Sequence, residues 1–140
     1  MSGQAAFWAI IALQAAGMPH QAHREVRRFW GAQMDAESMP GWAGHAHIVG
    51  PAFLLPRFAL GVQPVAPGFE RTQIRPQLGD LDWAEGIVPT PRGDIHLHWE
   101  AHPRLRGYIV LPEGMEAEAI LTRGASYVSR QLKPGENEIT

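Results

Sequence analysis

The sequence predicts an α+β fold in which N-terminal helices are followed by an antiparallel β-sandwich. Apolar residues before Gly61 recur at the spacing of an α-helix. After Gly61, short strand-like runs alternate with separators that are rich in proline and glycine. One of these runs, Asp94–Glu100, alternates apolar and polar residues without a break. The sequence therefore predicts two domains, which we place at residues 1–61 and residues 62–140.

The first expected helix covers the apolar run Ala5–Ala16. Apolar side chains fall on every side of it, so we expect this helix to be buried nearly all round. Gly17 is a typical helix-ending residue, and Pro19 is well placed in the first turn of a second helix. The apolar run would be about 18 Å long as a helix, too short to cross a ~30 Å membrane core. No basic residue precedes it, which favours a buried core helix over a signal sequence.

The second expected helix runs from Pro19 to Ala36. Glu25 and Arg28 are three residues apart in it, a spacing that allows an ion pair on the helix surface. The stripe expected to face a neighbour consists of Ala22, Val26, Phe29, Trp30 and Gln33.

A third helix is expected to begin at about His47 or Pro51 and to end at Leu60. Pro56 lies inside it, where the missing amide hydrogen predicts a kink. The following segment, Val62–Gly68, contains two prolines and is typical of a linker laid over a surface.

Six strands are expected in the second half of the chain, at a spacing typical of a sandwich. They are Phe69–Ile74, Leu81–Val88, Asp94–Glu100, Leu105–Leu111, Ala117–Thr122 and Tyr127–Leu132. In the clearest of them, Ile95, Leu97 and Trp99 share the face that we expect to be buried.

Composition excludes several classes of partner and chemistry. The chain has 140 residues and a formal net charge of −2, so it lacks the basic surplus typical of nucleic-acid or membrane-surface binding. It contains no cysteine, which excludes disulfides, thiolate metal sites and cysteine nucleophiles. That absence is typical of a reducing compartment, and we expect a cytoplasmic location. No nucleophile-elbow serine or phosphate-binding glycine loop is present, and no cofactor is expected.

Histidines suggest a metal site, which we weigh against a simpler interpretation. His96 and His98 project from the same strand face, and Glu100 and His102 lie close in sequence. Such a set is compatible with zinc or another divalent ion. The alternation of the strand favours instead the solvent-facing side of a half-buried strand. We therefore expect no metal.

Polar residues before the third helix offer two further candidates. Asp35 and Glu37 are followed by Trp42, but residues two apart on a helix do not face each other and make a poor catalytic pair. His45 and His47 lie in a glycine-rich turn. They are placed either to face one ligand pocket or to be solvated, and the sequence leaves both interpretations open.

Six stretches of the sequence together resemble the C-terminal part of bacterial α-L-rhamnosidases of glycoside hydrolase family 78. The stretches are FWAIIALQAAG (7–17), FWGAQM (29–34), GHAHIVGP (44–51), FLLPRFALGVQP (53–64), LDWAEG (81–86) and VPTPRG (88–93). The resemblance implies that the helices are the end of an (α/α)6 barrel and that the strands form the C-terminal β-sandwich domain. In the intact family it implies inverting hydrolysis of terminal α-L-rhamnosides.

The resemblance also assigns roles to residues between the second and third helices. Trp42 matches the tryptophan of an aromatic-Trp-Glu motif whose glutamate is the general base, and here the next residue is Ala43. His45 matches a histidine that lines the sugar site. We therefore expect no catalytic residue, substrate contacts from His45 and Trp42, and a chain that is inactive alone, because alanine cannot take a proton from water.

Two other functions remain as alternatives. A non-catalytic carbohydrate-binding module would use Trp42, Trp83 and Trp99 as a stacking face, although the alternation places Trp99 in the core. A subunit that completes a split glycoside hydrolase would bind a partner chain through the helical region. The expected partners are a rhamnose-containing glycan and either such a partner chain or a second copy, since barrel helices cut from their neighbours expose apolar surface.

Overall fold

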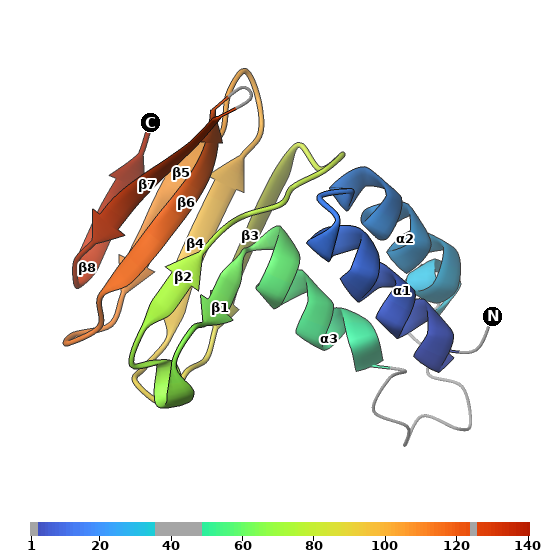
Figure 1. The fold of residues 1–140 in the computed structure, drawn as a ribbon, viewed down its shortest axis with the longest axis horizontal. Coiled ribbons are helices and arrows are strands. Elements are labelled where there is room, and N and C mark those ends of the chain that lie inside the picture. Colours follow the sequence, from blue (N-terminus) through green and yellow to red (C-terminus); the bar gives the residue numbers. More distant parts are fainter. Residues whose placement is uncertain (1–2, 36–48, 124–125) are drawn as a thin grey trace. The chain divides into compact units, whose positions relative to one another are not determined.

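The computed structural model describes residues 3–35, 49–123 and 126–140. These residues form two compact units, Met1–Leu55 and Pro56–Thr140. The first unit is helical and the second is a β-sandwich (Figure 1). The predicted α+β fold, helices followed by a β-sandwich, is confirmed.

Two helices, α1 (Gly3–Ala15) and α2 (Pro19–Asp35), pack against each other in the first unit. The turn between them is closed by two backbone bonds: the amide of Gly17 donates to the carbonyl of Gln14 at 3.0 Å, and that of Met18 to Leu13 at 2.9 Å. Gly17 has a φ of 70°, the left-handed conformation that this helix-ending motif requires. The predicted end of the first helix and start of the second are thus explained by the turn.

Helix α1 is buried on one side, not all round. Its buried residues follow helical spacing: Gly3, Ala6, Ile10 and Gln14. Trp8 on another side is 60% exposed, and Ala5 and Ala12 are also exposed. The expectation of nearly complete burial is therefore wrong within the part of the chain that the structure describes, because packing there covers only one face of α1.

Helix α2 buries the expected stripe as far as its side chains are described, since the side chain of Gln33 lies outside that part. Ala22, Val26 and Trp30 are buried, Phe29 is half-buried, and the buried His23 lies beside them. On the solvent side, the guanidinium of Arg28 donates from Nε to the carboxylate of Glu25 at 2.9 Å, which confirms the expected pair.

The third helix, α3 (Gly50–Leu54), continues into a π-helical turn, η2 (Leu55–Ala59). Pro56 lies in that turn and cannot donate an amide hydrogen bond to the preceding helical turn. The change from an α-helical to a wider π-helical turn is therefore a physical consequence of the proline. Within the first unit, α3 packs closely on the other helices: a Cβ added at Gly50 would lie 2.9 Å from the Trp30 ring.

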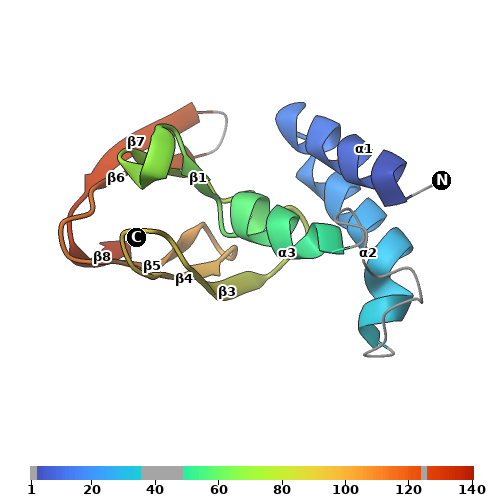
Figure 2. The ribbon, with the colours of Figure 1, turned by 90° about the horizontal axis from the view of Figure 1, so that it is seen from below.

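Two four-stranded sheets form the second unit, and they face each other as layers (Figures 1 and 2). One sheet has the order β1-β2-β6-β7, with strands β1 (Val62–Pro64), β2 (Thr72–Ile74), β6 (Ala117–Arg123) and β7 (Ser126–Leu132). The other has the order β3-β4-β5-β8, with strands β3 (Trp83–Val88), β4 (Ile95–Glu100), β5 (Arg106–Leu111) and β8 (Gly135–Ile139).

Strand pairing is antiparallel except between β2 and β6, which run parallel. The structure contains two strands that the sequence did not indicate, β1 and β8. Val62–Pro64, expected to be linker, pairs with Thr72–Ile74. Phe69, expected at the start of a strand, lies in the short helical turn η3 (Pro67–Phe69).

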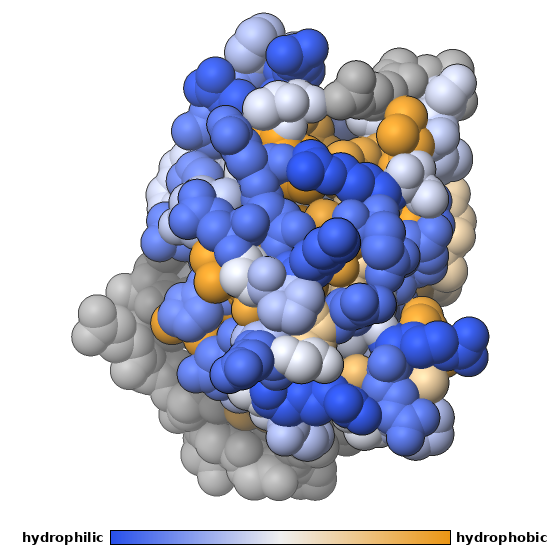
Figure 3. Space-filling view, turned by 90° about the vertical axis from the view of Figure 1, so that its left-hand side faces the viewer, coloured by the Kyte–Doolittle hydropathy of each residue, from blue (hydrophilic) through white to orange (hydrophobic). Residues whose placement is uncertain are grey.

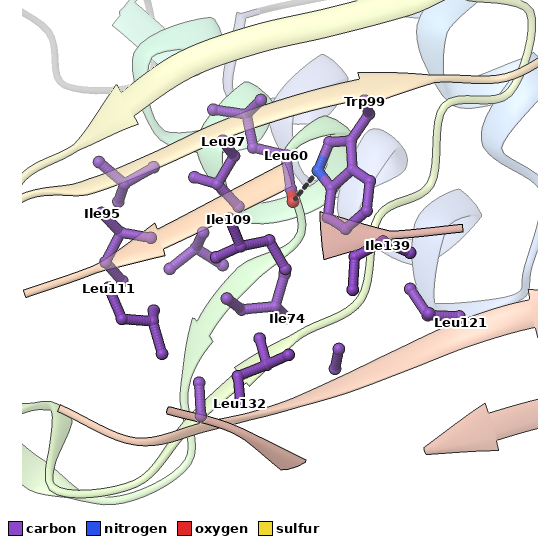
Figure 4. Packing of buried hydrophobic residues seen from close by; sticks show 14 of the residues in the cluster. Leu60, Ile74, Ile95, Leu97, Trp99, Ile109, Leu111, Leu121, Leu132 and Ile139 are labelled. Carbon is purple, nitrogen blue, oxygen red and sulfur yellow. Dashed lines mark hydrogen bonds between the residues drawn. The ribbon is translucent and has the colours of Figure 1, made fainter. Parts of the chain in front are cut away.

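The core of the sandwich receives side chains from both sheets and from the end of the helical segment (Figure 4). Ile95, Leu97 and Trp99 are all buried, which confirms the predicted inner face of β4. The indole N–H of Trp99 donates to the carbonyl of Leu60 at 3.1 Å, and the Leu60 side chain belongs to the same core. The last residues before β1 are thus part of the sandwich core.

Candidate functional site

The residues to which the resemblance assigned roles lie outside the described part of the chain. These are Trp42, Ala43 and His45, together with Glu37 and His47 of the other candidates. Their substrate-binding or solvated roles stay predictions.

The outer face of sheet β3-β4-β5-β8 brings together the polar residues of β4 with residues from its neighbours. Register places Glu85, His98, Tyr108 and Glu138 in one row across the four strands. A second row contains Trp83, Glu100 and Arg106. Side chains within a row lie close enough to interact directly.

His98 is held between two carboxylates and a phenol ring. Its Nδ1 atom lies 3.2 Å from Oε2 of Glu85, and its Nε2 atom lies 3.5 Å from Oε1 of Glu100. Its ring stacks on that of Tyr108 with centroids 5.5 Å apart and planes 14° apart. These contacts fix the orientation of both rings on the sheet surface.

Glu100 also binds Arg106, whose Nε atom donates to its Oε2 atom at 2.6 Å. The hydrogen bond from Arg106, followed by that from His98, holds the pKa of the Glu100 carboxyl below its usual value of 4.5. The Glu100 carboxylate is therefore ionised at neutral pH, with Arg106 and His98 as hydrogen-bond partners, and is not a candidate proton donor.

The hypothetical metal site on β4 does not form in the structure. No group of three His, Asp or Glu residues suited to a metal ion occurs within residues 3–35, 49–123 and 126–140. His96 is exposed, and His102 lies 3.5 Å from Asp82 at a separate, solvent-exposed position. His98 instead contacts the carboxylates of Glu85 and Glu100 and stacks on the Tyr108 ring.

A cleft of about 640 Å³ opens beside the Glu100–Arg106 pair. It lies between β4, β5 and β8 and the segment that precedes β5. The residues that form it include His98, Glu100, Arg104, Arg106, Tyr108 and Glu138. Its volume falls in the range typical of small-molecule sites, roughly 300–1,000 Å³.

The stacking face of three tryptophans does not exist on the sandwich. Trp99 is fully buried and engages Leu60, whereas Trp83 is 61% exposed on the edge strand β3. The end of the sandwich seen in Figure 3 is mostly hydrophilic, with hydrophobic residues in small separate groups. Such a surface lacks the broad apolar patch of a large interface.

The helical unit carries a second hollow, between α1 and α2. It has a volume of about 700 Å³. One side is apolar, formed by Ala9, Ala12 and Leu13 of α1 and by Ala16, which follows that helix. Its α2 side contains Gln21, Arg24, Glu25 and Arg28. An apolar wall beside charged groups is typical of a groove that receives another helix.

Sequence reasoning identified part of the sandwich site. It placed His98 and Glu100 on one strand face, but Glu85, Tyr108 and Arg106 were not singled out. Alternation along each strand would have placed them outward, but only the register shows that they meet.

Comparison with known proteins agrees with the fold. Residues 61–136 match the family described as bacterial alpha-L-rhamnosidase C-terminal domain. An alpha-L-rhamnosidase from Alteromonas sp. (strain LOR) is 54% identical over 41 residues, 29% of this chain and 4% of that protein.

Two solved structures are similar over almost the whole chain. The alpha-L-rhamnosidase from Dictyoglumus thermophilum has a TM-score of 0.75 and 16% identity, covering 94% of this chain and 20% of that one. The enzyme from Aspergillus terreus has a TM-score of 0.63 and 16% identity, covering 97% and 21%. This chain thus spans about a fifth of the length of the solved proteins that it resembles.

The sandwich that follows the helices is of the class found as the C-terminal domain of bacterial α-L-rhamnosidases. The family match covers more than half of the sequence. The chain belongs to the bacterial α-L-rhamnosidase C-terminal domain family. In the described part of the chain, no helix is long and apolar enough to span a membrane.

Proposed function

We propose that this chain serves as the C-terminal part of an α-L-rhamnosidase, providing the last helices of the catalytic barrel and the sandwich that follows. The observation that carries this proposal is the continuous structural match, which includes helices as well as strands and covers 94% of this chain. A binding module that used the sandwich alone would not need the helical pair.

The surface of the helical unit supports the proposal. Trp8 is 60% exposed, and the groove between α1 and α2 has an apolar wall. In a barrel of helices each helix has neighbours on both sides, so an apolar second face is expected. The remaining barrel helices, on another chain or on another segment, are the proposed occupants of this face.

The chain by itself is proposed not to hydrolyse rhamnosides. Ala43 stands where the family resemblance expects the general base, and a methyl group cannot accept a proton. Loss of one general acid–base group typically lowers a rate by about 10²–10⁴-fold. We expect no turnover of 4-nitrophenyl α-L-rhamnoside above a buffer blank by the purified 140-residue chain. Turnover that disappears in a His45→Ala variant would contradict the proposal.

Association provides an independent test of the helical surface. The exposed apolar face predicts concentration-dependent self-association, measured by sedimentation velocity, when no other barrel helices are present. Trp8→Ala should weaken it, whereas Trp83→Ala, at a tryptophan of equal exposure on the sandwich, should not. Equal effects of the two substitutions would argue against a specific helical docking face.

A further inference from the structure

The cleft beside Tyr108 and Arg106 combines an aromatic surface with fixed polar groups. Tyr108 is 37% exposed although one side of its ring is stacked on His98. His98 is itself fixed by Glu85 at 3.2 Å. The ring of Tyr108 is therefore held in place before any ligand arrives, which lowers the entropic cost of binding.

The polar groups of the cleft are also oriented in advance. Arg106 and Glu100 hold each other through the 2.6 Å hydrogen bond, yet a guanidinium has more N–H donors, and a carboxylate more lone pairs, than this pair uses. Among the described residues, neither the Arg104 guanidinium nor the Glu138 carboxylate forms an ion pair. Donors and acceptors therefore both remain available along the cleft.

Charge balance indicates what kind of ligand these groups would accept. The charge of Arg106 is compensated by Glu100, and the charges of Arg104 and Glu138 are opposite. Groups of both signs therefore line the cleft, together with Thr140 at the last position of the sequence. Hydroxyl groups, which both donate and accept, match the mixture of guanidinium and carboxylate groups.

We infer that this cleft binds a neutral sugar, with the C–H face of one pyranose ring on Tyr108 and its hydroxyls paired with Arg104, Arg106 and Glu138. Aromatic rings combine a flat apolar surface with a polar edge, and charged partners strengthen hydrogen bonds to hydroxyls. The site lies wholly on the sandwich, so it is independent of the proposed barrel-completing role. It would hold a glycan near the enzyme without taking part in bond cleavage.

Titration of the full-length ¹⁵N-labelled chain tests the inference by NMR. The probes are methyl α-L-rhamnopyranoside and cellobiose as neutral sugars and D-glucuronate as an anionic one. We expect saturable shifts of the backbone amides of Arg104, Gly107 and Tyr108 with at least one neutral sugar. The dissociation constant should be roughly millimolar, because the cleft is shallow and few groups contact the ligand.

Matched variants distinguish binding in the cleft from binding elsewhere on the protein and from loss of folding. Tyr108→Ala should weaken binding by about tenfold or more, whereas Tyr108→Phe should retain most of it because the ring remains. Tyr127→Ala, at an exposed tyrosine on the opposite sheet, should leave the affinity unchanged. Dispersed spectra of each variant establish that it is folded.

Several outcomes would overturn the inference. They are an absence of saturable shifts with both neutral sugars, shifts confined to residues outside the cleft, or binding of glucuronate alone. Unchanged affinity in folded Tyr108→Ala would do the same.

Discussion

Gly61 lies at the junction between the helical segment and the first strand, where the chain has no room for a side chain. Its φ is 87°, and a Cβ there would overlap the backbone of Arg75 and Pro76. The amide of Arg75 donates to the Gly61 carbonyl at 2.9 Å, which keeps these two backbone segments together. Glycine at this position therefore permits both the turn and the close approach.

Gly61→Ala should lower the free energy of unfolding by clearly more than the roughly 1–2 kcal/mol expected from a positive φ alone. The matched control is Gly135→Ala, because Gly135 has a φ of 88° and no atom within 4 Å of its added Cβ. The difference between the two variants in urea unfolding reports the steric overlap. Equal destabilisation would mean that the backbone around Arg75 yields easily.

The ion pair between Glu100 and Arg106 should make the stability of the fold depend on pH. Because the pKa of Glu100 is lowered from 4.5 in the folded protein, the pair adds stability above that value and loses it as the pH falls through the lowered pKa. The difference in urea midpoint between the natural chain and Glu100→Gln should be constant from neutral pH to about 5 and then shrink. A difference that grows as the solution becomes acidic would contradict the assigned sign.

Among the helices and strands, the sequence predicts the features that depend on residues close together in the chain. The alternation of Ile95, Leu97 and Trp99 follows from the two-residue period of a strand, and the end of α1 follows from Gly17. The strands β1 and β8 were not predicted, for different reasons. Val62–Pro64 is three residues long and acquires its strand conformation from distant pairing with β2, and Gly135–Ile139 is largely polar.

Asn137 organises the turn between β7 and β8. Its Nδ2 atom donates to the carbonyls of Lys133 at 2.8 Å and Gly135 at 3.0 Å, and its Oδ1 atom accepts from the Lys133 amide at 3.1 Å. One side chain thus satisfies several backbone groups of the turn that leads into β8.

Asn137→Ala should destabilise the chain by about 1–2 kcal/mol and speed hydrogen exchange most strongly in β8. The neighbouring Glu136→Ala, at an exposed position of the same strand, should change stability by less than about 0.5 kcal/mol. Exchange that accelerates evenly over both sheets would show that the effect is global and not a property of this turn.

At the scale of the whole molecule, the candidate site on the sandwich was predictable only in part. His98 and Glu100 could be placed on one face from their spacing, but Tyr108 and Arg106 reach them through the register of β4 with β5. Register depends on which strands pair over long distances, and local sequence does not determine it. The positions indicated by family resemblance, Trp42, Ala43 and His45, lie outside the described residues.

The change in composition predicts a domain boundary after residue 61. The two compact units of the structure instead meet between Leu55 and Pro56. The Leu60 side chain is part of the sandwich core, and its carbonyl accepts the Trp99 indole N–H at 3.1 Å. A fragment of residues 56–140 would keep both contacts, and a fragment of residues 62–140 would lose both. The two fragments therefore distinguish the two boundaries.

We expect the longer fragment to be more stable to urea by at least about 2–5 kcal/mol, the usual cost of removing a buried leucine side chain. Trp99→Phe provides the second half of the comparison. In residues 56–140 it leaves the buried Leu60 carbonyl unpaired and should cost about 1–3 kcal/mol, whereas in residues 62–140 that acceptor is already gone and the cost should be much smaller. Equal costs in both fragments would show that the bond to Leu60 does not tie the end of the helical segment to the sandwich.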